Sequence, residues 1–216
     1  NMVDEMFDYG RVILKEKRKN PSDDLLSAIA NAEIEGKELT DEFLDGSWLL
    51  IIFAGNDTTR NTISGGIKLL HENQKQKELL MRDSELLPNF IHETIRCVSP
   101  VIHMRRTSLQ ETEIRGQRIG PFEKISLWYG AANRDPDIFE NPNEFNILRE
   151  NADKHLAFGI GRHTCLGKPI ALMQLREFYS QFLTRFKDFE LNGEWKVAPN
   201  NFVHAIQEMP IKYTPE

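Results

Sequence analysis

The sequence predicts a mainly α-helical protein with a few small β-sheets, an α+β architecture, and three features support this prediction. The first two-fifths of the chain carries successive segments with helical spacing of apolar residues, several of them preceded by helix-capping residues. After Pro100 the pattern changes to short strand-like runs separated by glycine turns, and another long helical segment follows near the C-terminus. Many helices with a few minor strands are typical of an α-dominated fold.

The composition fits a globular protein and argues against two classes. The chain has 216 residues, of which 40% are hydrophobic and 28% charged, and its 27 basic and 33 acidic residues give a net charge of −6. An acidic chain of this kind is not expected to bind nucleic acid. The longest apolar run covers seven residues, 48–54, whereas a membrane span needs about 20. No repeat or linker interrupts residues 1–216, which we predict to form a single domain.

The cysteines and the N-terminal residues indicate the cellular compartment in which the protein is expected. Cys97 and Cys165 are 68 positions apart and neither belongs to a CxxC pair. A disulfide scaffold and a structural zinc site are therefore poor interpretations, and a reducing compartment is expected. The first residues lack the basic start and apolar stretch of a signal peptide. We therefore expect a cytoplasmic protein.

The first two predicted helices are separated by a break at residues 20–22. Residues 2–19 are amphipathic and end in a basic run that we expect to face water. Ser22 can cap the second helix, whose acidic first turn at residues 23–24 complements the helix dipole. This second helix is expected to stop near Gly36.

A long third helix is predicted to begin after Thr40, whose side chain can cap it. Its helical pattern continues through Leu70, and its middle is apolar all round. We therefore expect it to run through the core rather than over it. Two shorter helices follow at residues 74–82 and 86–97, and the second has a proline in its first turn.

Short strands are expected after Pro100. Residues 112–120 have the glycine turns of a hairpin, and a strand follows at residues 124–127. Residues 135–150 are predicted to be irregular because prolines interrupt them. A last long helix at about residues 166–186 and short closing strands complete the prediction.

The middle of the long helix carries the motif AGNDTT at residues 54–59. Gly55 weakens a helix by about 1 kcal/mol relative to alanine, and Thr58 can bond to carbonyls of its own helix. An acid, Asp57, and a hydroxyl in an apolar interior need partners. Two interpretations stay open: a kink filled by water, or a groove that lets a ligand approach the helix, with a proton relay beside it.

Glu93 and Arg96 form a second pattern, because a separation of three places both charges on one helix face. Such pairs are common on protein surfaces. The spacing alone therefore does not distinguish a functional pair from a solvated one.

The third motif, FGIGRHTCLG at residues 158–167, is the most specific. Two glycines shape a loop that ends at Cys165, and a helix starts directly after it. Backbone N–H groups and the positive helix end stabilise an anion there, so we expect a thiolate that suits iron ligation or nucleophilic attack. A nucleophile needs a base, and His163 is poorly placed to turn back toward a residue two positions away. A buried structural cysteine is the remaining alternative.

These three motifs, in this order and at these separations, resemble the C-terminal half of a cytochrome P-450, a haem-thiolate monooxygenase. The similarity spans nearly the whole chain, and ANRDP (132–136) and HLAFG (155–159) resemble the bacterial, soluble branch. The resemblance implies part of the P-450 fold, with a long central helix, small sheets and a cysteine haem-binding loop, whose N-terminal half is absent. The chain alone is then expected to expose an apolar face along residues 48–53, to bind haem weakly and not to be a competent enzyme.

For the cofactor, the resemblance makes Cys165 the proximal thiolate ligand to the iron of haem b. His163 and Arg106 would reach the haem propionates, and Arg105 is the rival of Arg106 because a one-residue slip would exchange them. Further residues would pack against the porphyrin, namely Ala54, Phe158, Gly159, Gly161, Gly167 and Ala171.

The resemblance also assigns a role to the acid and the hydroxyl of the long helix. Asp57 and Thr58 match the pair through which the family delivers protons during catalysis, a form of general acid catalysis through water. The intact pair argues against the peroxide-using relatives, which lack it at this place.

Glu93 and Arg96 match the helix pair that locks the proximal side of the family's haem site. The family often adds a downstream arginine to this pair, but the usual position before Phe145 holds Glu144 here. The residue that would act as this downstream arginine is therefore unassigned, and Arg149 is one possible substitute for it.

Substrate contacts are placed by position at six apolar residues: Leu50, Phe53, Val101, Ile102, Phe202 and Val203. We therefore expect an apolar substrate of terpenoid, steroid or alkyl type. The resemblance implies an O₂-dependent oxidoreductase, monomeric at full length, that receives electrons from NAD(P)H through a ferredoxin reductase and a ferredoxin. The alternatives are a haem-binding sensor or degenerate relative without monooxygenase activity, and a helical interaction module without haem.

Overall fold

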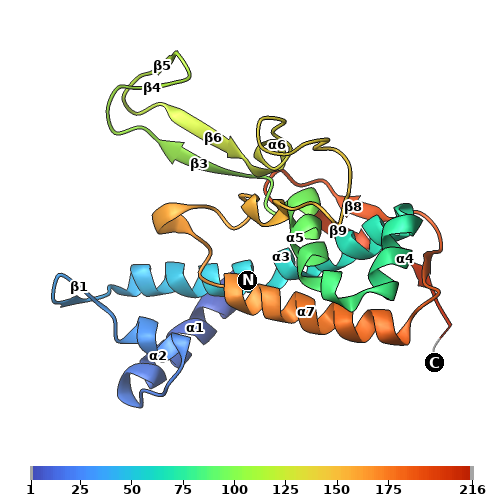
Figure 1. Cartoon of the computed structure of the whole chain (residues 1–216). Helices are drawn as coiled ribbons and strands as arrows, with labels where there is room; N and C mark the ends of the chain where they lie inside the picture. The colour runs from blue at the N-terminus through green and yellow to red at the C-terminus, as the bar shows by residue number, and fades with distance from the viewer. Residues whose placement is uncertain (1, 215–216) are drawn as a thin grey trace. The chain divides into compact units, whose positions relative to one another are not determined.

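The computed structural model describes residues 2–214, which form two compact units (Figure 1): an N-terminal unit that ends at Asn56 and a C-terminal unit that begins at Asp57. The helices are α1 (Met2–Lys19), α2 (Leu25–Ala30), α3 (Asp41–Glu72), α4 (Gln74–Arg82), α5 (Leu87–Val98), α6 (Tyr129–Ala132) and α7 (Lys168–Arg185), with 3₁₀ turns η1 (Ser84–Leu86), η2 (Ala152–Lys154) and η3 (Gly161–His163). The strands are β1 (Glu33–Ile34), β2 (Lys37–Glu38), β3 (His103–Thr107), β4 (Thr112–Ile114), β5 (Gln117–Ile119), β6 (Lys124–Trp128), β7 (Glu190–Leu191), β8 (Lys196–Ala198), β9 (Ala205–Glu208) and β10 (Ile211–Lys212).

The mainly α-helical fold with small antiparallel sheets is confirmed. The cap of the long helix α3 is also as predicted, because the N–H of Phe43 donates to Thr40 Oγ1 at 3.3 Å. None of the helices in residues 2–214 is both long and apolar enough to cross a membrane. The prediction of a single domain stays a prediction.

The start of α2 differs from the prediction, which assigned its cap to Ser22. Asp24 is the capping residue: its backbone is extended, with φ −145° and ψ 162°, and its Oδ1 accepts a hydrogen bond from the N–H of Ser27 at 2.8 Å. Ser22 donates its hydroxyl to Asp24 Oδ2 at 2.6 Å instead. Both residue types can cap a helix, and the carboxylate at the later position takes the role because it reaches a free N–H of the first turn.

The end of α2 also differs, because the helix stops at Ala30 rather than near Gly36. Residues 33–38 form the two-residue hairpin β1–β2, in which Ile34 pairs with Lys37. Glu35 and Gly36 have φ values of 54° and 74°, the left-handed conformation that such a tight turn requires. The glycine therefore marks a hairpin turn, not a helix end.

The N-terminal unit is organised around Trp48 of α3. The Nε1–H of Trp48 donates to the carbonyl of Met6 in α1 at 3.0 Å. A Cβ at Gly10 would lie 2.6 Å from the Trp48 ring, so only glycine lets α1 approach this closely. The buried apolar residues of this unit are Leu14, Ala30, Leu39, Leu44 and Trp48.

The middle of α3 does not lie in the core as expected. Leu50 is 65% exposed and Phe53 is 42% exposed, and Leu49 and Ile52 are similarly exposed. The apolar face expected for the isolated chain is therefore present, except that Trp48 at its start is 5% exposed. Apolar residues all round a helix indicate that it should be covered, but they do not say which residues cover it.

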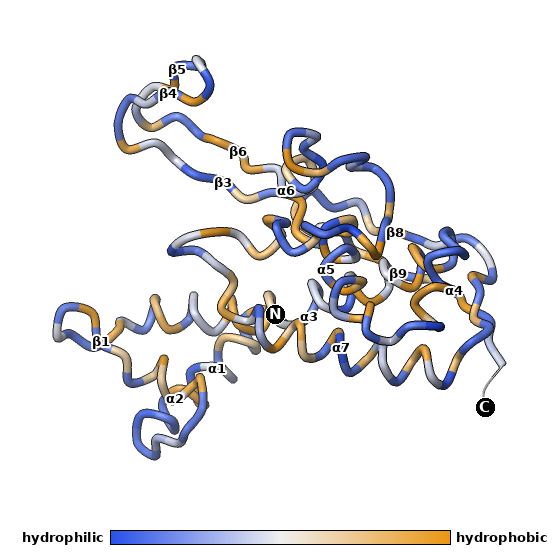
Figure 2. Tube along the Cα trace, in the orientation of Figure 1, coloured by the Kyte–Doolittle hydropathy of each residue, from blue (hydrophilic) through white to orange (hydrophobic). Residues whose placement is uncertain are grey.

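The C-terminal unit has its core where α5, α7 and the end of α3 meet (Figures 1 and 2). Tyr179 of α7 is fully buried, and its hydroxyl lies 2.9 Å from the carbonyl oxygen of Ile63 and 3.1 Å from that of Thr62. Burial raises the pKa of Tyr179, which keeps the hydroxyl a donor. A Cβ at Gly66 would collide with this hydroxyl, so α3 and α7 pack through a glycine.

Small antiparallel sheets complete the C-terminal unit. Strand β3 pairs with β6, with Arg106 opposite Ile125 and Met104 opposite Leu127. The predicted glycine hairpin is β4–β5, and Arg115 and Gly116 form its left-handed turn with φ values of 49° and 80°. Side chains alternate between faces along a strand, so Arg105 and Arg106 point to opposite faces of the β3–β6 sheet.

The turn between β5 and β6 contains a strained residue, Phe122, with φ 63° and a side chain that is 75% exposed. A non-glycine residue in this conformation costs about 1–2 kcal/mol, and glycine's extra freedom in the unfolded chain offsets about 0.5–1 kcal/mol of the gain. We expect Phe122→Gly to raise the free energy of unfolding of the full-length protein by up to about 1.5 kcal/mol, measured by denaturant titration. Leu109 is 85% exposed without a left-handed φ, so Leu109→Gly should not stabilise. Equal effects of the two variants would contradict the prediction.

Candidate functional site

The loop before α7 is closed by its own backbone. Gly159 and Gly161 have φ values of 68° and 69°, which glycine adopts without strain. The N–H of Cys165 donates to the carbonyl of Phe158 at 2.8 Å, and the N–H of Thr164 donates to that of Gly161 at 3.1 Å. A Cβ at Gly159 would lie 3.1 Å from the carbonyl oxygen of His163, so this approach also favours glycine. The sequence of the motif thus folds into a compact turn that presents Cys165.

The two free cysteines have different surroundings. Cys165 is exposed and lies two residues before Gly167, the N-cap of α7. Cys97 lies in α5 beside Glu93 and Arg96, and burial raises the pKa of its thiol to about 11. Cys97 is therefore an unreactive thiol at neutral pH, while Cys165 is the accessible one. The alternative that Cys165 is a buried structural cysteine is wrong.

The loop fits a haem held by a single thiolate. An exposed sulfur on a short, internally bonded loop, next to glycines without side chains, leaves a flat group room to approach the thiol. Among residues 2–214, no group of three or more His, Cys, Asp or Glu side chains could hold a metal ion, so the donor set does not indicate a metal cage. The loop brings together Phe158, Gly159, Gly161, His163, Cys165 and Gly167.

Phe158 at the start of the loop is positioned by two neighbours. Its ring lies 5.6 Å from the ring of His155 and 5.6 Å from Lys168 Nζ. Burial, and next the proximity of His92, lower the pKa of His155 to about 4, so its ring is neutral at pH 7. The N–H of Ala157 donates to His155 Nδ1 at 3.3 Å, which leaves Nε2 to donate to His92 Nδ1 at 3.4 Å.

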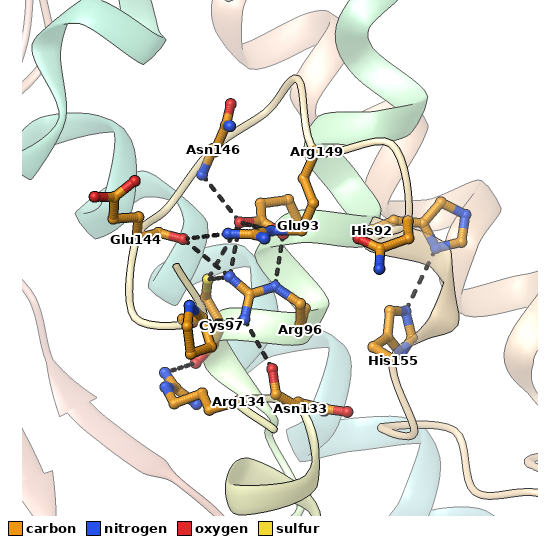
Figure 3. A network of polar contacts seen from close by, with 12 residues as sticks. His92, Glu93, Arg96, Cys97, Asn133, Arg134, Glu144, Asn146, Arg149 and His155 are labelled. Carbon is orange, nitrogen blue, oxygen red and sulfur yellow. Dashed lines mark hydrogen bonds and ion pairs between the residues drawn. The ribbon is translucent and has the colours of Figure 1, made fainter. Parts of the chain in front are cut away.

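Glu93 and Arg96 are fully buried in α5 and form a bidentate pair (Figure 3). Arg96 Nε lies 2.7 Å from Glu93 Oε2, and Nη2 lies 2.8 Å from Oε1. The helical spacing predicted this pair, and the solvated alternative is wrong because both side chains are 0% exposed. The N–H of Asn146 also donates to Glu93 Oε1, at 2.9 Å.

Arg149 supplies the third member of this cluster. Its Nε lies 3.1 and 3.2 Å from the two carboxylate oxygens of Glu93, and its side chain is 7% exposed. Glu144, at the usual family position, contributes only its backbone carbonyl, which accepts from Arg96 and Arg149 at 3.0 and 3.1 Å. The resemblance named Arg149 as one substitute for the third role, and this contact bears it out. Arg149 lies 56 residues after Glu93, so no helical spacing could have identified it.

The two arginines also fix a stretch of chain without regular structure. Their remaining N–H groups donate to backbone carbonyls at 2.5–3.2 Å, those of Asn133, Glu140, Asn141, Pro142 and Glu144. The cluster of Glu93, Arg96 and Arg149 therefore ties α5 to the irregular segment that leads to the Cys165 loop.

Asp57 and Thr58 lie at the start of the C-terminal unit, in α3. Asp57 Oδ1 accepts from Arg60 Nη2 at 2.7 Å, an i,i+3 pair in which the Asp57 side chain is 29% exposed. The Thr58 carbonyl accepts the Thr62 hydroxyl at 2.8 Å. The residues predicted just before them, Leu50, Phe53 and Ala54, belong to the N-terminal unit, and their roles toward haem and substrate stay predictions.

Two segments predicted to contact substrate meet in the C-terminal unit. Val101 forms an antiparallel bridge with Val203, and the N–H of Ile102 donates to the Phe202 carbonyl at 2.8 Å. These pairs are about 100 residues apart in sequence, and only the fold joins them. Val203 is 3% exposed, so it packs within the unit, whereas the other three are partly exposed.

Arg106 is half-buried and Arg105 is exposed on the other face of β3. Arg106 Nη1 donates to the Arg105 carbonyl at 2.9 Å. Ala171 is half-buried in the first turn of α7, and His163 is exposed in η3. The choice between Arg105 and Arg106 as a propionate contact stays a prediction that favours Arg106.

Comparison with known proteins covers almost the whole chain. The family model described as Cytochrome P-450 matches residues 1–214. The chain is 38% identical over 211 residues to a steroid C26-monooxygenase of Mycobacterium tuberculosis (strain CDC 1551 / Oshkosh), which covers 96% of this chain and 56% of that protein. It is 35% identical over 215 residues to linalool 8-monooxygenase of Pseudomonas putida, covering 100% of this chain and 53% of that protein.

The fold agrees with this family. The solved structure of cytochrome P-450-153 from Novosphingobium aromaticivorans superposes with a TM-score of 0.90 at 36% identity, over 99% of this chain and 53% of that one. The chain therefore spans about half the length of the relatives it matches. The family model, the fold and the cysteine loop agree, and the chain belongs to the cytochrome P-450 family.

Proposed function

We propose that this chain is the haem-binding portion of a haem-thiolate monooxygenase that uses O₂ to hydroxylate an apolar small molecule. The observation that carries the proposal is Cys165, an exposed free thiol on a glycine loop at the N-terminal end of α7. Bound haem b would supply the chemistry that activates O₂. The chain's own residues would bind it, orient it and deliver protons.

The proximal side supports the thiolate. Phe158, Gly159 and Gly161 would border the ring, as would Gly167, the N-cap of α7, and Ala171 in the first turn of that helix. His163 and Arg106 would bind the propionates as charge-assisted donors. The buried cluster of Glu93, Arg96 and Arg149 keeps the segment before the loop in place.

Asp57 and Thr58 would carry out the proton delivery. A carboxylate that is 29% exposed can exchange protons with water, and a hydroxyl on the next residue can orient a donated proton toward the reacting centre.

The substrate is proposed to be a terpenoid, a steroid or an alkyl compound, because the expected contact residues are all apolar. Two relatives are named for linalool and steroid oxidation. Electrons would come from NAD(P)H through a ferredoxin reductase and a ferredoxin. The proposed location is the cytoplasm.

The test is a carbon monoxide difference spectrum of the reduced protein, recorded on the full-length protein and on the 216-residue chain. The full-length protein should show a strongly red-shifted thiolate-type band. The short chain should show little or none, because its exposed face at residues 49–53 disfavours a stable haem site. A histidine-type band in the full-length protein would contradict the ligand assignment, and no haem uptake would contradict the family-based function.

A further inference from the structure

Asn61 of α3 bridges two segments of the C-terminal unit that are far apart in sequence. Its side chain is 0% exposed. Its Nδ2 donates to the backbone carbonyl of Asp57 at 2.8 Å, and its Oδ1 accepts from the backbone N–H of Ile206 in β9 at 2.9 Å. A buried amide with both ends satisfied joins the helix to a strand 145 residues later.

The chemistry of these contacts selects asparagine. A carbonyl can only accept and a backbone N–H can only donate, so the two partners determine which end of the amide faces which. A carboxylate at this position would lose the donor, and a hydrocarbon would lose both bonds and leave the Ile206 N–H without this acceptor. Both hydrogen bonds therefore require a side chain of this size that carries a donor as well as an acceptor.

One of the two segments it joins is expected to deliver protons, and the other follows the residues that are expected to contact substrate. Asp57 and Thr58 lie one turn before Asn61 on α3. Strand β9 begins two residues after Val203, and residues 202–203 meet residues 101–102 through a β-bridge and a hydrogen bond. A shift of β9 relative to α3 would therefore displace one set of residues against the other.

We propose that Asn61 is a positioning residue that sets the acid–alcohol segment of α3 in register with β9 and, through β9, with the expected substrate contacts Phe202 and Val203. This inference rests on the proposed monooxygenase function. Through the Asp57 carbonyl, Asn61 fixes the helix turn that carries the relay. Through the Ile206 N–H, it fixes the strand that follows the substrate contacts.

Two variants separate these contacts in the full-length, haem-loaded protein. Asn61→Asp keeps an acceptor for Ile206 and, in its ionised form, has no donor for Asp57, so it is measured up to alkaline pH. Asn61→Leu loses both bonds. Both variants should lower the product formed per NADH consumed by about fivefold, the factor expected for one lost hydrogen bond. Only Asn61→Leu should also weaken substrate binding in a spectral titration, by a similar factor.

Asn73 offers a matched control. Its Nδ2 donates to the carbonyl four residues earlier, Leu69, at 2.8 Å, the same local bond without a link to β9. Asn73→Leu should leave product per NADH and substrate binding at the wild-type values, while all folded variants keep the thiolate-type band.

The inference would be overturned if Asn61→Asp kept the thiolate-type band and formed as much product per NADH as the wild type. If Asn61→Leu fails to fold, Asn61→Asp alone provides the test. An equal loss in Asn73→Leu would also overturn the inference. A wild-type protein that consumes NADH without forming product would instead contradict the proposed function.

Discussion

Cys165→Ala is expected to abolish the thiolate-type carbon monoxide band of the full-length protein and to lower product formation by at least about 1,000-fold. That factor corresponds to a loss of about 4 kcal/mol in transition-state stabilisation. Cys165 is the exposed thiol of the chain, and the loop that carries it is bonded through its own backbone. Alanine keeps the small volume and the N–H bond to Phe158, so the loop should fold while the ligand is lost.

The matched control is the other cysteine. Cys97→Ala removes a thiol whose pKa burial raises to about 11, and it should leave both the band and the turnover unchanged. Spectra of the reduced, CO-bound protein and product yields from one preparation measure both quantities. Retained turnover in Cys165→Ala, or its loss in Cys97→Ala alone, would show that the wrong cysteine has been assigned.

Glu93→Gln is expected to lower the free energy of unfolding of the full-length protein by about 3–5 kcal/mol, the range for breaking a buried ion pair. Two guanidinium groups, Arg96 and Arg149, share this carboxylate, and neither side chain is more than 7% exposed. A neutral amide would leave both positive charges in the interior without a counterion. Denaturant unfolding with a haem-absorbance readout measures the effect.

Glu78→Gln is the control for this prediction. Glu78 pairs with Arg82 at 3.4 Å on α4, with side chains 63% and 78% exposed. Solvent screening limits such a pair to less than about 1 kcal/mol, so the variant should unfold at nearly the wild-type denaturant concentration. Comparable losses in the two variants would mean that the Glu93 cluster does not have the special stability that its burial implies.

Local rules were sufficient where neighbours in sequence decide the structure. The cap at Thr40, the hairpin at residues 112–120 and the spacing of Glu93 and Arg96 all follow from contacts within a few residues. The cysteine motif likewise encodes its own loop, because its glycines and its N–H bonds are internal to residues 158–165. The resemblance carried by these motifs then predicted the family correctly.

Rules based on neighbouring residues failed where two residues close together in sequence were equally suited to the same role. Ser22 and Asp24 are both helix-capping types, and the observed cap depends on which one reaches the N–H of Ser27. The apolar pattern of α3 predicted a buried helix, whereas the resemblance predicted that this chain alone exposes its middle; Leu50 and Phe53 are 65% and 42% exposed, as the resemblance predicted. An apolar helix surface indicates that other residues must cover it, but it does not identify those residues.

The sequence by itself therefore determined the fold class, the family and the cysteine expected to bind iron, because each of these is encoded in short, contiguous patterns. The sequence named Arg149 only as one substitute for a third arginine, and the tertiary structure decided that it completes the Glu93 cluster. The tertiary structure alone decided that Asn61 joins α3 to β9. These contacts join residues 56 and 145 positions apart. No periodicity extends over such distances, and a buried polar group finds its partner only when packing has brought the segments together.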